Sequence, residues 1–154
     1  MKTRRLLVVL LLATLLPGLG ACNLTESERT LVRDLEERLD RWNQHRPQSY
    51  TFELEQRCDC PDEVELPTTI HVDGVEVVWA RDSATDSELA SGDPRVRTID
   101  DIFARLIDHA RRDGSGVSIE FNVEYHYPLE AHAWVSAGAV EDFGYRVRWF
   151  EPAD

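Results

Sequence analysis

Strict alternation of apolar and polar residues is the feature that most constrains how this chain folds. In SYTFELEQ, residues 49–56, the side chains of Tyr50, Phe52 and Leu54 share one face, and polar side chains share the other. GVSIEFNVEY, residues 116–125, alternates in the same way. Because successive side chains of a β-strand point to opposite faces, both segments are predicted to be strands with one buried and one solvated face. Such strands are typical of antiparallel sheets.

A helix is predicted ahead of each of these strands. The first spans residues 23–46 and opens on a capping-box pair, Thr25 and Glu28. The second starts at Thr98, with Asp101 as the capping partner, and carries apolar residues at helical spacing. The members of that apolar stripe are Ile99, Ile102, Phe103, Leu106, Ile107 and Ala110.

Further strands are predicted after each of the first two. Residues 68–80 are expected to form a hairpin whose turn, Asp73–Gly74, is of type I′. This turn places Val75, Val77 and Trp79 on the second strand of the hairpin, before a polar surface loop over residues 81–97. In the second half, a strand is expected over residues 129–136. The apolar positions of the last expected strand are Phe143, Tyr145, Val147 and Trp149.

The predicted order is therefore one helix and three strands, twice over. This order favours an α+β fold, with two helices packed on one face of an antiparallel sheet of about six strands. No sequence identity between the halves supports a true duplication, so the repeat is one of architecture only.

The first residues of the chain are typical of an export signal. Lys2, Arg4 and Arg5 precede an apolar run from Leu6 to Leu16, which is too short to span a bilayer. The run is followed by Pro and Gly and then by small residues, as expected ahead of a cleavage site.

The segment LGAC, residues 19–22, resembles a bacterial lipobox. We therefore expect residues 1–21 to be a lipoprotein signal peptide, residues 22–24 a lipidated N-terminus and short tether, and residues 25–152 a single globular domain. Acyl chains on Cys22, palmitate among them, would anchor the protein to a membrane on the extracytoplasmic side of the cell envelope. The alternative is an ordinary signal peptide cut near Ala21.

The charge of the chain excludes some partners. Removal of Lys2, Arg4 and Arg5 with the signal peptide takes the net charge from −12 to −15. So acidic a surface repels nucleic acid and anionic lipid headgroups, and it favours basic partners. Because Lys2 is the only lysine, the mature chain lacks the lysine that a Schiff base or a phosphate-binding loop requires.

Several pieces of the chain together resemble a family of uncharacterised small bacterial lipoproteins. They are the lipobox, YTFELEQRCDCP, VDGVEV, TIDDIF and VEYHYPLE. The resemblance implies a fold and a cellular location but no activity. The family usually has Gly at the position of His126, which implies that any role of His126 is peculiar to this chain. The helix-and-meander layout is also similar to that of secreted inhibitor and binding modules, a likeness of fold alone.

Cys58 and Cys60 are separated by a single residue in RCDCP, and this spacing allows three interpretations. Residues i and i+2 of a straight strand have Cα atoms about 6.5 Å apart, near the upper limit for a disulfide, and a local kink would bring them into range. In an oxidising compartment a disulfide is favoured. A metal site is the second reading, because two thiolates suit Cu(I), although zinc spacing is absent. Redox chemistry is the third, opposed by the neighbouring Asp59 and Asp62.

A polar face near the end of the chain is the predicted binding surface. If the hairpin around Pro128 is regular, His126 lies opposite His132 and Glu124 lies opposite Trp134, which is close enough for two imidazoles to share a metal or a proton. The alternative is a solvated face with ordinary charge pairs. The predicted surface consists of Glu120, Glu124, His126, His132, Trp134, Arg146 and Arg148.

No motif in the chain points to catalysis. G-x-S-x-G, H-E-x-x-H and Gly-rich phosphate loops are absent from the sequence. We therefore expect a non-catalytic, membrane-anchored binding module without a cofactor, whose partner is an envelope protein or a small ligand and not nucleic acid. The alternative function is a metal-binding or thiol-redox envelope protein that uses Cys58 and Cys60.

Overall fold

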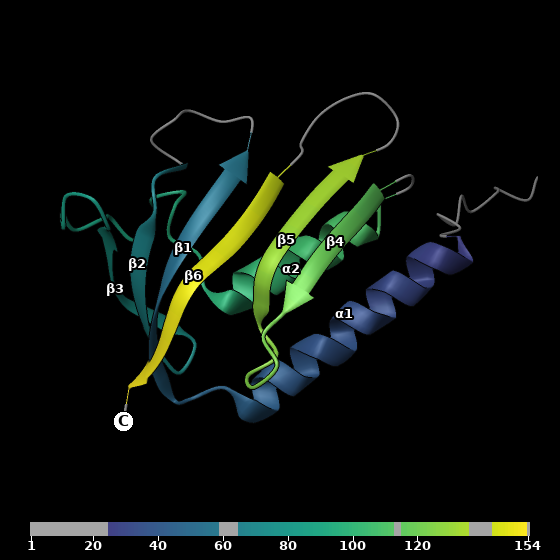
Figure 1. The fold of residues 1–154 in the computed structure, drawn as a ribbon, viewed down its shortest axis with the longest axis horizontal. Helices are drawn as coiled ribbons and strands as arrows, with labels where there is room; N and C mark the ends of the chain where they lie inside the picture. The colour runs from purple at the N-terminus through teal and green to yellow at the C-terminus, as the bar shows by residue number, and fades with distance from the viewer. Residues whose placement is uncertain (1–24, 59–64, 113–114, 136–142, 154) are drawn as a thin grey trace, which may run out of the picture.

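The computed structural model describes residues 25–58, 65–112, 115–135 and 143–153. The elements are α1 (Glu26–His45), β1 (Ser49–Cys58), β2 (Thr68–Asp73), β3 (Glu76–Asp82), α2 (Ile99–Ala110), β4 (Ser115–Phe121), β5 (Pro128–Val135) and β6 (Phe143–Ala153). They follow one another as one helix and three strands, twice, as the sequence predicts (Figure 1).

Both helices begin with the capping boxes that the sequence predicts. In α1 the Thr25 side chain accepts the Glu28 N–H, and the Glu28 carboxylate accepts the Thr25 N–H at 2.6 Å. Thr98 and Asp101 make the same reciprocal pair at the start of α2. These bonds satisfy N–H groups that the first turn of a helix leaves without partners.

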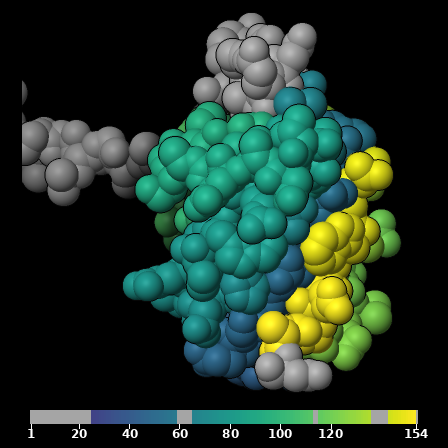
Figure 2. Space-filling view, turned by 90° about the vertical axis from the view of Figure 1, so that its left-hand side faces the viewer, coloured from purple at the N-terminus to yellow at the C-terminus, as the bar shows by residue number. Residues whose placement is uncertain are grey.

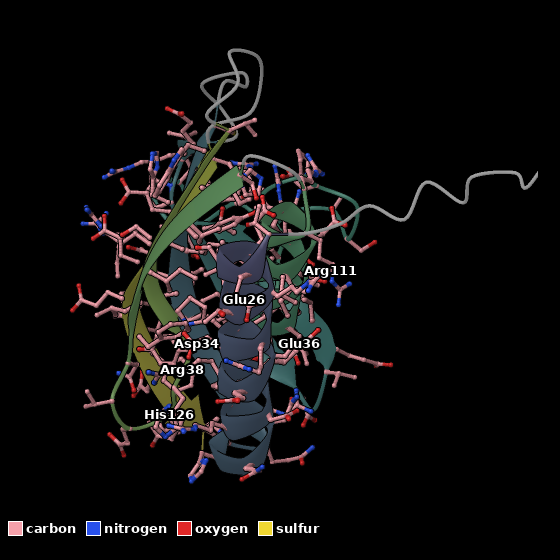
Figure 3. All side chains as sticks on the ribbon, turned by 90° about the vertical axis from the view of Figure 1, so that its right-hand side faces the viewer. Glu26, Asp34, Glu36, Arg38, Arg111 and His126 are labelled. Carbon is pink, nitrogen blue, oxygen red and sulfur yellow. The ribbon has the colours of Figure 1, made fainter. Side chains whose placement is uncertain are left out.

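The six strands form one antiparallel sheet in the order β3-β2-β1-β6-β5-β4. The central pair, β1 and β6, joins the two halves of the chain along ten register pairs, from Ser49↔Ala153 to Cys58↔Phe143. The sheet lies in front of both helices in Figure 1 and is seen nearly edge-on in Figure 3, where the helices cover one side only. The α+β fold predicted from the sequence is therefore confirmed.

The core lies between the helices and the covered side of the sheet. Trp42 of α1 is fully buried and meets the rings of Tyr50, Tyr127 and Phe150 edge-on, with centroids 5.4–6.0 Å apart. Edge-to-face packing of this kind adds to the stabilisation from burial alone. Around this aromatic cluster, α2 contributes its whole apolar stripe to the core.

The prediction of one strand over residues 116–125 is wrong at its C-terminal end. β4 ends at Phe121, and the Asn122 side chain then accepts the backbone N–H groups of Glu124 and Tyr125. Such a side-chain bond stabilises a turn in place of a strand. His126 follows with φ of +65°.

The predicted pairing of this hairpin is also wrong. Ser118 lies opposite His132, and Glu120 lies opposite Glu130. Because the turn starts earlier than the alternation suggests, the register differs by eight residues from the one that would place His126 opposite His132. His126 therefore does not share a face with His132.

The β2–β3 turn consists of Gly74 and Val75, because Asp73 pairs with Glu76. Gly74 has φ of +61°, and among the described non-glycine residues only Asp86 and His126 have a positive φ. A positive φ at the first central position alone belongs to a type II′ turn, so the predicted type I′ turn at Asp73–Gly74 is wrong.

At two β-bulges the alternation of faces along a strand shifts, and each shift affects a tryptophan. Val78 has no pairing partner in the β2–β3 register, so Trp79 lies opposite His71 on the exposed face. The β1–β6 register skips Arg148, so Trp149 lies opposite Glu53. Since a bulge inserts one residue into a strand, side chains beyond it change faces.

Candidate functional site

The candidate site lies on the outer face, the side of the sheet that the helices leave uncovered (Figure 3). Its centre carries charges that are paired across strands. Arg146 donates to Glu130 at 2.6 Å and lies 4.0 Å from Glu55, while Arg148 lies 3.4 Å from Glu53. The hydrogen bond from Arg146 lowers the pKa of the Glu130 carboxyl. Each arginine at the centre of the face is therefore paired with at least one carboxylate, and the five groups together carry one negative charge in excess.

Two rings lie beside this charged centre, and we call them the aromatic platform: His132 and Trp134 of β5. Their ring planes are nearly parallel, 27° apart, and their centroids are 5.8 Å apart. The indole of Trp134 lies across Gly116 of β4, where a β-carbon would come within 2.5–2.6 Å of three ring atoms. The His132 ring leans toward Gly144 of β6, whose added β-carbon would be 3.7 Å from Nδ1. Glycine at position 116 thus lets the Trp134 indole lie close to the sheet, whereas a β-carbon at position 144 would meet the His132 ring at an ordinary van der Waals distance.

The platform is held from the core side by His109 of α2. This histidine is only 1% exposed, and its Nε2 lies 3.0 Å from the carbonyl oxygen of Trp134. Because a carbonyl only accepts, Nε2 carries the hydrogen and donates it. The ring of His109 also meets Phe143 edge-on at 5.2 Å. Trp134 is therefore fixed by its backbone and by its ring, while 37% of the residue stays exposed.

Polar side chains border the platform. Ser118 is exposed and lies opposite His132 on β4, and Gly144 lies between His132 and Arg57 in the same row of the sheet. Glu120 and Glu130, opposite one another, follow along the strands. A rigid exposed indole with hydrogen-bonding groups around it is an arrangement that binds neutral polar ligands by stacking.

The structure brings together most residues of the predicted binding surface but not all of them. Glu120, His132, Trp134, Arg146 and Arg148 belong to β4, β5 and β6 and contribute to the outer face. Glu124 and His126 belong to the turn after β4 and lie apart from them.

His126 lies against α1 and meets His45 edge-on, with ring centroids 5.2 Å apart. Its burial, and then the positive charges of His45, Arg41 and Arg38, lower the pKa of His126 (Figure 3). The paired imidazoles expected for a metal or proton site are thus absent at His126 and His132. Among the described residues, no group of three or more His, Cys, Asp or Glu side chains is placed to hold a metal ion.

Sequence reasoning missed the residues that support the platform. His109 stands beside the apolar stripe of α2, and Gly116 looks like an ordinary strand residue. Their roles depend on which strand positions face Trp134 and His132, and that follows only from the register. The one available signal was a histidine next to an otherwise apolar helix face.

Cys58 ends β1 and packs against the core, opposite Phe143. Cys60 and Cys22 lie outside the described residues, so their predicted disulfide and lipidation stay predictions. No helix in the described ranges is long and apolar enough to cross a membrane.

Comparison with known proteins gives the chain a family but no activity. No curated protein matches it. The model of a protein family of unknown function, DUF6174, matches residues 34–152, from the middle of α1 to the end of β6. Because the match covers well over half of the chain, this protein belongs to the DUF6174 family of unknown function.

Proposed function

We propose that this protein is a lipid-anchored lipoprotein on the extracytoplasmic face of the cell envelope, and that it is a non-catalytic binding module. The support is the order of basic residues, apolar run and LGAC at the start of the sequence. α1 begins at Glu26, four residues after Cys22, and an extended chain of that length reaches at most about 14 Å. The domain is thereby expected to stay close to the membrane surface.

We further propose that the aromatic platform binds a neutral glycan of the envelope. The observation that carries this proposal is Trp134, an exposed indole held flat on Gly116 and tethered through its carbonyl to buried His109. Ordering such a side chain costs little on binding, because its freedom is already lost. Sugar rings stack their C–H groups on an indole, and their hydroxyls bond to carboxylates and guanidinium groups.

The charge pattern favours a neutral ligand over an ionic one. Arg146 is shared between Glu55 and Glu130, and Arg148 is next to Glu53, so neither arginine is left free to pair with an anionic ligand. The net charge of −12, which becomes −15 when the three positive charges of the signal peptide are removed, opposes nucleic acid and anionic headgroups. Binding at the platform is therefore expected to depend weakly on salt.

Co-sedimentation with purified, insoluble envelope polysaccharide tests the glycan proposal. Trp134→Ala is expected to weaken retention at least about ten-fold, as for a central aromatic contact. Trp149→Ala is the matched control, because Trp149 is 40% exposed near the other end of the same face and is expected to leave retention unchanged. Equal retention of Trp134→Ala and the wild type would contradict the proposal, as would capture of a protein in place of the glycan.

Metabolic labelling with a fatty acid tests the anchor separately. The full chain is expected to incorporate label and to sediment with membranes, and Cys22→Ser is expected to lose both properties. A wild-type chain that carries no label and stays in the soluble fraction would contradict the anchor while leaving the glycan test intact.

Cys58 and Cys60 are proposed to form a small disulfide at the end of β1. The one-residue separation of the two cysteines and the oxidising compartment outside the membrane support this pairing. Mass spectrometry of the purified protein is expected to find it lighter than the reduced chain by two hydrogens. A retained copper or zinc ion, or glycan binding lost in a folded Cys58→Ser/Cys60→Ser variant, would instead favour the metal or redox function.

A further inference from the structure

The outer edge of the sheet at β3 is open over part of its length. At its C-terminal end, β3 is covered by the following segment: Leu89 N–H donates to the Ala80 carbonyl, and Asp82 N–H donates to the Ser87 carbonyl, both at 2.9 Å. Within the described ranges, residues 76–79 have no such partner on that side. Figure 2 looks onto this edge, where β2, β3 and the following segment form the teal surface.

A cleft of about 370 Å³ lies next to the open part of the edge. Its size falls within the range of ligand-binding clefts. Val78, which occupies the bulge, is 59% exposed, and Val75 in the turn is 63% exposed. The apolar residues that line the cleft include Val75, Val77, Val78, Trp79, Leu89 and Val96. An exposed apolar strand edge is a template for pairing with another chain.

Two carboxylates flank the cleft. Glu88 lines it and Glu76 begins the open edge, and neither forms an ion pair with another described residue. The nearby arginines are occupied, since Arg81 lies 3.2 Å from Asp86 and Arg95 lies 2.9 Å from Asp82. This edge is therefore complementary to a basic partner.

The far wall of the cleft is fixed in place. Asp82 is buried and accepts the backbone N–H groups of Ala84 and Thr85, while its other oxygen accepts from Arg95. Arg95 also donates to both oxygens of Asp93. Because these bonds hold residues 82–95 together, a ligand does not have to order this segment on binding.

We propose that the edge at residues 76–79 binds an extended segment of a partner protein as an added antiparallel or parallel strand. Main-chain hydrogen bonds to β3 supply affinity, apolar side chains of the segment enter the cleft, and its Lys or Arg residues pair with Glu76 and Glu88. This site is separate from the aromatic platform, which lies at the opposite side of the sheet on β5.

Synthetic hexapeptides that alternate valine and arginine are suitable probes of this edge. Their binding to the folded domain is followed by NMR shifts of backbone amides. We expect the largest shifts at residues 76–79 and at Leu89. A peptide with glutamate in place of arginine is expected to bind about ten-fold more weakly, and an N-methylated version is expected not to bind.

Matched variants separate the edge from the rest of the surface. Val78→Lys places a charge on the open edge and is expected to abolish peptide binding, while Val123→Lys, at a position 90% exposed in the turn after β4, is expected to bind like the wild type. Glu76→Lys/Glu88→Lys serves as a second variant if Val78→Lys unfolds.

Several outcomes would overturn the proposal. They are shifts centred on β5 and β6, equal binding of the N-methylated peptide, equal binding of the glutamate peptide, and no binding at millimolar peptide. Trp134→Ala is expected to leave peptide binding unchanged, so this test and the glycan test fail independently.

Discussion

The indole of Trp134 lies flat across the backbone of Gly116, where a β-carbon would come within 2.5 Å of the ring. No unstrained contact between two carbon atoms is that short, so Gly116→Ala is expected to displace the indole. We predict that this variant loses glycan retention about as strongly as Trp134→Ala.

Gly92→Ala is the control for this substitution, because an added β-carbon on Gly92 meets no atom within 4 Å. Co-sedimentation and tryptophan fluorescence report binding and ring environment together. A Gly116→Ala protein that binds normally would show that the position of the indole does not matter.

Trp42 and Trp149 test the assignment of the two faces. Trp42 is fully buried among three aromatic rings, whereas Trp149 is 40% exposed beyond the Arg148 bulge. Trp42→Ala is expected to lower the free energy of unfolding by about 3–5 kcal/mol, and Trp149→Ala by less than about 1 kcal/mol. Urea unfolding measures both losses. Similar losses would mean that Trp149 is buried too, which contradicts its place on the exposed face.

His126 is expected to make stability depend on pH. Burial, and then the neighbouring charges of His45, Arg41 and Arg38 on α1, lower its pKa. The unfolded chain therefore takes up a proton at higher pH than the folded chain does. Stability is unaffected well above pH 6.5 and falls as the pH drops below about 6.5.

His126→Gly is expected to remove this part of the pH dependence. Because φ at this position is +65°, glycine is also expected to keep or raise stability at pH 8, by up to about 1 kcal/mol. Urea unfolding at pH 5 and pH 8 measures the effect, with His132→Gln as the control that keeps the slope. If the dependence of stability on pH were unchanged in His126→Gly, another titratable group would have to be its cause.

Asp82 is expected to hold the wall of the β3 cleft. The backbone N–H of Thr85, then that of Ala84, and Arg95 lower the pKa of its carboxyl. The stabilisation is therefore present above the ordinary pKa of aspartate, about 3.9, and is lost as the pH falls below it.

Asp82→Asn is expected to speed amide hydrogen exchange in residues 83–97 at pH 7 and to weaken binding of the valine–arginine peptide several-fold. Asp86→Asn removes only the exposed partner of Arg81 and is the matched control. Exchange as slow in Asp82→Asn as in the wild type would show that the wall is held by other contacts.

Local periodicity predicts most of the fold. The capping pairs at Thr25 and Thr98, the apolar stripe of α2 and the alternation around Phe52 are each encoded within a few residues. Errors arise where one residue changes the parity of a strand. The bulge at Arg148 turns Phe150 toward Trp42 and Tyr50, and that choice depends on packing between distant segments.

The candidate site is predictable only in part, for the same reason. His132 and Trp134 alternate with Ala131 and Ala133, which places them on the exposed face without knowledge of their neighbours. The roles of Gly116 and His109 depend on the β4–β5 register and on helix packing. A tight turn at Asn122 sets that register. The alternation of apolar and polar residues in the sequence continues beyond this turn and therefore does not reveal it.

NMR titration of the indole N–H signals tests the central claim most directly. The four tryptophans give separate reporters: Trp42 in the core, Trp79 and Trp149 elsewhere on the sheet, and Trp134 on the platform. With soluble oligosaccharides released from the envelope, we predict that the Trp134 signal shifts most and that the Trp42 signal stays still. Binding that leaves the Trp134 signal unmoved, or no shift at millimolar oligosaccharide, would contradict a glycan-binding platform.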